Sequence, residues 1–168
     1  IPQLDAEIAF MRANTDGMVV DMTRNTGGGC IGLDYAARMI PQRFWFFGEH
    51  FRPTLGTLNN YISLLDLAKR LQLDQWVIDT YQQLVDEYTL ALSENRAMTG
   101  PLPSCVTSIP RDVASLYRPA TWENEPEPGA YDKPMIFLAD EFSVSFGDIF
   151  PAMMQDNNRG PIVGMRTG

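Results

Sequence analysis

Residues 135–148 read MIFLADEFSVSFGD, and this stretch decides the fold class of the chain. Its apolar run, residues 135–139, predicts a buried strand. A short polar junction follows at residues 140–145, and residues 146–157 have the composition of a helix. A buried strand that passes through a tight junction into a helix is typical of α/β layering.

A second unit of the same kind lies near the start of the chain. Residues 4–14 carry apolar side chains at helical spacing, and residues 18–22 predict another buried strand. A glycine-rich loop at residues 23–29 then leads into a helix predicted over residues 30–40. A third strand is predicted to start at residues 161–164. The fold class expected from these elements is α/β.

The middle of the chain has a different pattern. Residues 58–70 and 74–93 both fit a period of 3.6 and predict two amphipathic helices in a helical hairpin. Prolines punctuate residues 99–130, which are expected to be irregular, with an acidic surface loop at residues 123–129. We therefore expect residues 53–130 to form a helical and proline-rich insertion.

An aromatic segment precedes this insertion. Residues 44–51 are dense in aromatic side chains: Phe44, Trp45, Phe46, Phe47 and Phe51. We expect them to pack in the core or at a domain interface, and an apolar substrate groove is the alternative.

Composition excludes several classes of function. The chain has 168 residues, 45% hydrophobic and 20% charged, which is normal for a folded domain. Its net charge of −8 argues against nucleic acid or an anionic membrane surface as a partner. No apolar run reaches about 18 residues, so no membrane span is expected. The chain opens at Ile1 without a signal peptide, so we expect a processed chain or an excised fragment.

The two cysteines, Cys30 and Cys105, leave the redox compartment open. One pair cannot form a disulfide framework; a single disulfide is compatible with the sequence, and two unpaired thiols are favoured. The spacing of histidine, cysteine and acidic residues predicts no metal site, and we expect no cofactor.

Two loops could carry chemistry. In the first, residues 24–29 read RNTGGG, and glycines allow several backbone N–H groups to point toward one phosphate or oxyanion. The loop lacks both the GxGxxG spacing and a Walker lysine, which argues against nucleotide binding. A plain tight turn is the alternative.

The second loop places Ser145 at or near the start of the helix predicted over residues 146–157. A capping serine is the ordinary role at such a position. The alternative is a nucleophile, since the helix dipole and neighbouring N–H groups could stabilise negative charge there. The surrounding residues do not form the GxSxG elbow.

Taken together, the two loops resemble a known family. Residues 17–28 read GMVVDMTRNTGG and resemble the G-hydrophobic-D-hydrophobic-R-x-N-x-GG segment of the tail-specific, or carboxy-terminal processing, serine proteases. Residues 133–150 resemble the nucleophile segment of that family, and residues 155–164 are similar to its QD-x-x-R-x-x-hydrophobic-VG. The resemblance covers residues 4–40 and 132–168. Two departures are a glycine at position 147, where a serine is common, and a one-place shift of the Arg-Asn arrangement.

The resemblance implies that residues 1–168 are a single, partial catalytic domain with a ClpP/crotonase-like layered core. The chain would be a hydrolase that cleaves peptide bonds through a serine acyl-enzyme. Ser145 matches the nucleophile, the Phe146 N–H would be one oxyanion donor, and Gly27 or Gly28 would supply the other. The partner would be a polypeptide substrate, and a homo-oligomer is compatible with the family. The compartment is unknown; the family favours the periplasm or secretion.

The general base is the element that the chain lacks by this comparison. The family lysine would fall beyond Gly168, and the upstream histidine of other members is absent. Lys133 lies before the strand whose far end carries Ser145, roughly 17–20 Å away. Lys69 is expected to face solvent, and His50 to be a surface or packing residue. We therefore expect the base outside the chain and an isolated fragment without activity.

Two other functions stay open. One is a non-catalytic module that binds an apolar ligand or a protein, because retinoid-binding repeats of vertebrates resemble these proteases. The other is a crotonase-like acyl-CoA enzyme, which uses a similar pair of amides. The family usually carries a PDZ module, and no PDZ-like segment is visible in this sequence.

Overall fold

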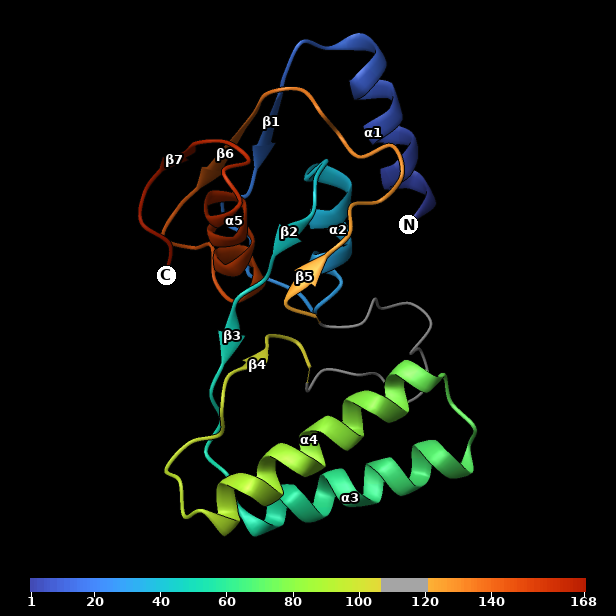
Figure 1. The fold of residues 1–168 in the computed structure, drawn as a ribbon. Helices are drawn as coiled ribbons and strands as arrows, with labels where there is room; N and C mark the ends of the chain where they lie inside the picture. Colours follow the sequence, from blue (N-terminus) through green and yellow to red (C-terminus); the bar gives the residue numbers. More distant parts are fainter. Residues whose placement is uncertain (107–120) are drawn as a thin grey trace. The chain divides into compact units, whose positions relative to one another are not determined.

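The computed structural model describes residues 1–106 and 121–168 and divides the chain into two compact units (Figure 1). Residues 1–46 and 123–168 make up the first unit. Residues 47–122 make up the second.

The first unit is built on a three-stranded sheet. Its strands are β1 (Met18–Asp21), β6 (Met135–Ala139) and β7 (Ile162–Gly164), in the order β1-β6-β7, and both pairs are parallel. Asp21 pairs with Leu138, so the carboxyl ends of β1 and β6 lie next to each other. All three strands occur where the sequence predicts them.

Three helices belong to this unit: α1 (Pro2–Asn14), α2 (Gly32–Met39) and α5 (Phe146–Asp156). Their positions confirm the predicted helices to within a few residues.

The two faces of β6 differ in burial. Phe137 is fully buried and contacts Phe150 of α5 edge to face, with ring centroids 6.3 Å apart, whereas Ile136 is 40% exposed. The core therefore lies between α5 and one face of the sheet.

A short antiparallel pair corrects one prediction. β2 (Phe44–Trp45) pairs with β5 (Glu123–Asn124), and Asn124 is buried. The acidic surface loop predicted at residues 123–129 is therefore wrong for its first two residues. The prediction of core packing holds for Phe44 and Phe46, which are buried, but not for the exposed Trp45.

The second unit contains the predicted pair of helices. These are α3 (Leu55–Arg70) and α4 (Gln75–Ser93). One short strand, β3 (Gly48–Glu49), precedes them in the sequence and pairs with another, β4 (Leu102–Pro103), that follows them. The core between the helices includes Tyr61 and Tyr88, whose rings meet edge to face at 5.2 Å. Of the segment predicted to be irregular, residues 99–130, the part from 107 to 120 lies outside the described residues.

Neither Cys30 nor Cys105 is a free thiol, so the expectation of two unpaired thiols is wrong. Within residues 1–106 and 121–168, no helix has the length and apolar character needed to cross a membrane. The same residues contain no cluster of three or more histidine, cysteine or acidic side chains suited to a metal ion.

Candidate active site

The two loops singled out in the sequence meet at the carboxyl ends of β1 and β6. Because these strands are parallel and adjacent, their following loops leave from the same edge of the sheet. The Met22 N–H donates to the Leu138 carbonyl at 2.9 Å, and the Val144 N–H donates to the Asn25 carbonyl at 3.0 Å. The glycine-rich loop and the serine loop are therefore joined directly through their backbones.

Ser145 occupies the position just before α5, but it does not cap the helix. Its side chain accepts no capping hydrogen bond, and the residue is exposed. Its backbone has φ 57° and ψ −127°, a conformation that a residue with a side chain adopts only under strain. Such strain costs on the order of 1–3 kcal/mol and clusters at functional sites. The capping role, which is the ordinary one, therefore does not account for this serine.

Gly27 lies against the backbone around Ser145. A Cβ atom added to Gly27 would stand 2.7 Å from the Ser145 Cβ and 2.9 Å from the Phe146 nitrogen. Gly27 also has φ +91°, which favours glycine. By contrast, a Cβ on Gly28 would meet nothing within 4 Å. The two glycines thus have different roles: the first permits close approach, and the second faces open space.

The backbone N–H groups distinguish the two glycines further. The Gly27 N–H donates to the Asn25 Oδ1 at 2.9 Å, so it is already engaged. Among residues 1–106 and 121–168, the N–H groups of Gly28 and Phe146 donate no hydrogen bond. Of the donors considered from the sequence, Gly28 and Phe146 are therefore the two that are available.

Asn25 is the residue that sequence reasoning missed. Its side chain orients Gly27, its own N–H donates to Met22 at 3.1 Å, and its carbonyl accepts from Val144. A Cβ on Gly147 would overlap that same carbonyl, which explains the glycine where the family commonly has serine. The motif contains this asparagine, but no pattern in a single sequence reveals that it joins both loops.

Asp140 and Ser143 fix the serine loop through hydrogen bonds. Ser143 is fully buried, and its hydroxyl donates to the Met22 carbonyl at 2.8 Å. The Asp140 carboxylate accepts from the Arg24 N–H at 2.9 Å and also from Phe142 and Ser143. The Arg24 hydrogen bond, more than any other contact, keeps the pKa of Asp140 below its usual range. A carboxylate held in this way is a weak base, so its role here is to fix the loop.

The three basic side chains considered from the sequence each have a partner other than Ser145. Lys133 precedes β6, at the strand end opposite Ser145, and its Nζ donates to the Thr15 carbonyl. In the second unit, the Lys69 Nζ donates to Gln82 at 3.4 Å, and the His50 Nδ1 lies 2.9 Å from the Thr99 carbonyl.

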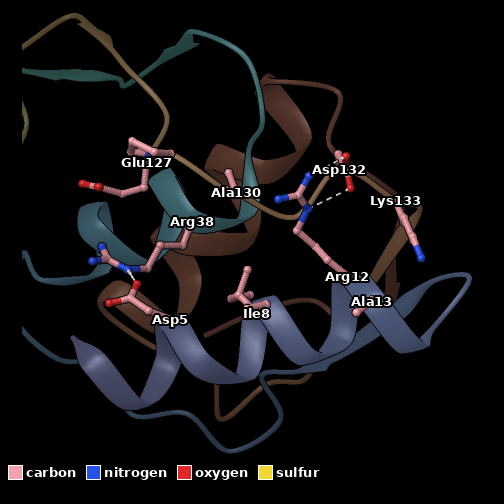
Figure 2. A pocket seen from close by; sticks show the side chains of 12 residues that line it. Asp5, Ile8, Arg12, Ala13, Arg38, Glu127, Ala130, Asp132 and Lys133 are labelled. Atoms are coloured by element: carbon pink, nitrogen blue, oxygen red, sulfur yellow. Dashed lines mark hydrogen bonds and ion pairs between the residues drawn. The ribbon is translucent and has the colours of Figure 1, made fainter.

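A cavity of about 240 Å³ adjoins the two loops, and Gly27, Gly28 and Phe146 belong to its wall. A larger hollow of about 760 Å³ lies between α1 and residues 127–133. Figure 2 shows two ion pairs in its wall, Arg12 with Asp132 and Arg38 with Asp5. The larger hollow contains no residue of either loop, so size alone does not identify the site.

Comparison with known proteins finds relatives of this chain. A protein of Chlamydia pneumoniae is 23% identical over 166 residues, and one of Chlamydia trachomatis serovar D is 27% identical over 178 residues. Each match covers 95% of this chain, but the chain spans only 27% and 28% of those proteins. The crystal structure of mature CPAF superimposes with a TM-score of 0.70 at 20% identity, over 99% of this chain and 33% of that one, which shows a shared fold.

The family model "Peptidase family S41" matches residues 2–168, almost the whole chain. This match confirms the resemblance to carboxy-terminal processing serine proteases. The chain belongs to peptidase family S41.

Proposed function

We propose that this chain carries the nucleophile of a serine endopeptidase and that Ser145 is that nucleophile. The observation that supports it most is the uncapped, strained and exposed Ser145 next to the available N–H of Phe146. The backbone conformation of Ser145 costs free energy, and its hydroxyl does not cap the helix. We therefore infer that this conformation serves the reaction and not the stability of the fold.

The oxyanion would be bound by two backbone N–H groups. We assign these to Phe146 and Gly28, because the Gly27 N–H already donates to Asn25. In the reaction, the Ser145 Oγ attacks the peptide carbonyl carbon while a general base accepts its proton. The carbonyl oxygen becomes negative and accepts hydrogen bonds from the two amides, each worth roughly 10²–10³ in rate. The base then gives the proton to the leaving amine, and water hydrolyses the acyl-enzyme.

The general base would come from outside residues 1–168. The contact of Lys133 with Thr15, at the opposite end of β6 from Ser145, supports this proposal. We therefore expect the chain alone to have no peptidase activity. Turnover of an unstructured peptide by residues 1–168, lost in Ser145→Ala, would contradict this.

The architecture of the parent protein follows the same proposal. Residues 1–168 would form a single, partial catalytic domain whose parallel sheet belongs to a ClpP/crotonase-like core. Residues 53–130, with α3 and α4, would be an insertion in that domain. The partner would be a polypeptide substrate, and the parent protein could assemble from several copies.

A fluorophosphonate probe tests the proposal on the parent protein that contains this chain. We expect the probe to label Ser145 and the label to disappear in Ser145→Ala. Ser63→Ala is the matched control, because Ser63 is an exposed serine on α3, and this variant should label normally. An unlabelled parent protein that binds apolar ligands or a protein partner would instead favour a non-catalytic module.

A further inference from the structure

Arg24 and Phe142 form a pair across the two loops that meet at Ser145. Both side chains are exposed, and the Arg24 guanidinium lies over the Phe142 ring, with its Cζ 5.7 Å from the ring centroid. A guanidinium within about 6 Å of an aromatic face is attracted to it. Each loop contributes one residue, so the pair adds a side-chain contact to the backbone hydrogen bond between Val144 and Asn25.

The backbone of this pair is held by one carboxylate. The N–H groups of Arg24 and Phe142 both donate to the Asp140 Oδ1, at 2.9 and 3.1 Å. Because one oxygen atom binds both residues, their side chains are brought together by the fold itself. The pair is therefore in place before any ligand binds.

The backbone of Arg24 is strained, as is that of Ser145. Arg24 has φ 57°, in the left-handed region that favours glycine. Gln72, Asn95 and Asn158 also have positive φ, but each lies just after the end of a helix, where this conformation is common. Arg24 follows a strand, so this ordinary explanation does not apply to it. Strain of this kind clusters at functional sites.

The charge of Arg24 has no counterpart within residues 1–106 and 121–168. Its guanidinium forms no ion pair and donates no hydrogen bond to these residues. The Asp21 Oδ1, on the same loop, accepts instead from the N–H and the hydroxyl of Thr23. A guanidinium carries five N–H donors in a planar fork that matches a carboxylate. The group is therefore available to an anion that comes from outside the chain.

Chain length limits the distance between this charge and the reaction. Arg24 is three residues before Gly27 in the sequence, and Phe142 is three residues before Ser145. Three residues span at most about 11 Å, and Gly27 lies against the Ser145 backbone. An extended substrate advances about 3.3 Å per residue. The guanidinium is thus within reach of a substrate side chain one to three residues from the cleaved bond.

We propose that Arg24, held over Phe142, binds an acidic side chain of the polypeptide substrate close to the cleaved bond. This inference rests on the proposed function of Ser145. It adds a substrate class, polypeptides with Asp or Glu within three residues of the cleavage position. Arg24 is then a specificity residue that binds substrate and takes no part in the proton transfers.

Matched peptides test this with the parent protein that contains the chain. An unstructured peptide is made with an amidated C-terminus, which excludes a free C-terminal carboxylate as the anion. Asp or Asn is then placed at each position up to three residues on either side of the cleaved bond. At one or more positions, kcat/KM should be roughly 3- to 10-fold higher for Asp than for Asn. High salt should reduce this preference, because the site is exposed.

Three variants identify the group that recognises the acid. Arg24→Gln should remove the difference between the Asp and Asn peptides. Arg24→Lys keeps the charge but not the planar fork, so it should retain only part of the preference. Arg166→Gln is the charge-matched control, because Arg166 is an exposed arginine of the same unit, and it should keep the wild-type preference. The ratio compares two peptides on one preparation, so it does not depend on how much of a variant is folded.

The results separate this inference from the proposed function. Cleavage without an Asp preference, or a preference that Arg24→Gln retains, overturns the inference alone. An equal loss in Arg24→Gln and Arg166→Gln also overturns it, since overall charge and not a specific site would then act. A parent protein that cleaves no peptide and is not labelled at Ser145 overturns the proposed function, and with it the assignment of Arg24 to substrate.

Discussion

Gly27 and Ser145, which are 118 positions apart in the sequence, approach so closely that a Cβ on Gly27 would stand 2.7 Å from the Ser145 Cβ. Real Cβ atoms essentially never come so near another heavy atom, so one of the two backbones would have to move. The position of the serine therefore depends on the absence of a side chain in another loop.

The first prediction concerns this contact. Gly27→Ala should destabilise the fold by roughly 1–3 kcal/mol, because alanine is strained at φ +91° and meets the serine backbone. It should also slow fluorophosphonate labelling of Ser145 about 10²-fold or more, since the oxyanion donors shift. Thermal unfolding and labelling rates measure the two effects.

Gly28→Ala is the matched control, because its Cβ enters open space and its N–H is kept. This variant should unfold at nearly the wild-type temperature and still label. If Gly27→Ala labels as fast as Gly28→Ala, the close approach has no part in the chemistry.

The second prediction separates two roles of Asn25. One is to accept the hydrogen bond from the Gly27 N–H, and the other is to keep negative charge away from the oxyanion. Asn25→Asp keeps an oxygen that accepts from the Gly27 N–H, so the loop should stay folded. At pH 7 the new carboxylate is ionised, and its negative charge opposes the developing oxyanion. Labelling of Ser145 should fall, while the unfolding temperature stays close to that of the wild type.

Asn25→Ala removes the acceptor instead and leaves the Gly27 N–H without its partner. We expect lower stability, by roughly 1–3 kcal/mol, together with slower labelling. Circular dichroism melts and labelling time courses on both variants give the comparison. A fully active Asn25→Asp would show that Asn25 does not face the oxyanion site.

The three strands of the sheet and their helices could be predicted well from the sequence, because each is a local pattern. The apolar run at 135–139 and the periodicity of 74–93 need only neighbours along the chain. The pairing of Glu123 with Trp45 could not be predicted in this way, since two-residue strands leave no periodic signal.

The candidate site was predictable in its residues but not in its details. Ser145 and the glycines follow from the motifs of the family, yet the sequence left Gly27 and Gly28 as equal donors. Only the hydrogen bond from Gly27 to Asn25 distinguishes them, and it depends on the conformation of one loop.

A third prediction follows from Asp140, whose pKa the Arg24 N–H lowers more than any other contact. The pKa of this carboxyl is lower in the folded protein than its value of about 3.9 in an unfolded chain. Its contribution to stability is thus present above that value and is lost as the pH falls through the lower, folded-state pKa. Asp140→Asn should therefore lower the unfolding temperature at pH 7, with a smaller difference from the wild type near pH 3. A difference of the same size at both pH values would contradict this linkage.

The last prediction tests whether the chain contains its own base. Lys133→Met removes the amine that donates to the Thr15 carbonyl, so α1 and β6 lose one connection and the unfolding temperature should fall slightly. Labelling of Ser145 in the parent protein should not change, since Lys133 lies at the opposite end of β6. His50→Gln should also label normally, because the His50 Nδ1 is already engaged with the Thr99 carbonyl. If Lys133→Met remains folded but loses labelling, the amine must reach Ser145 in the active protein. The base would then lie within these residues, and the contact with Thr15 would have to break during the reaction.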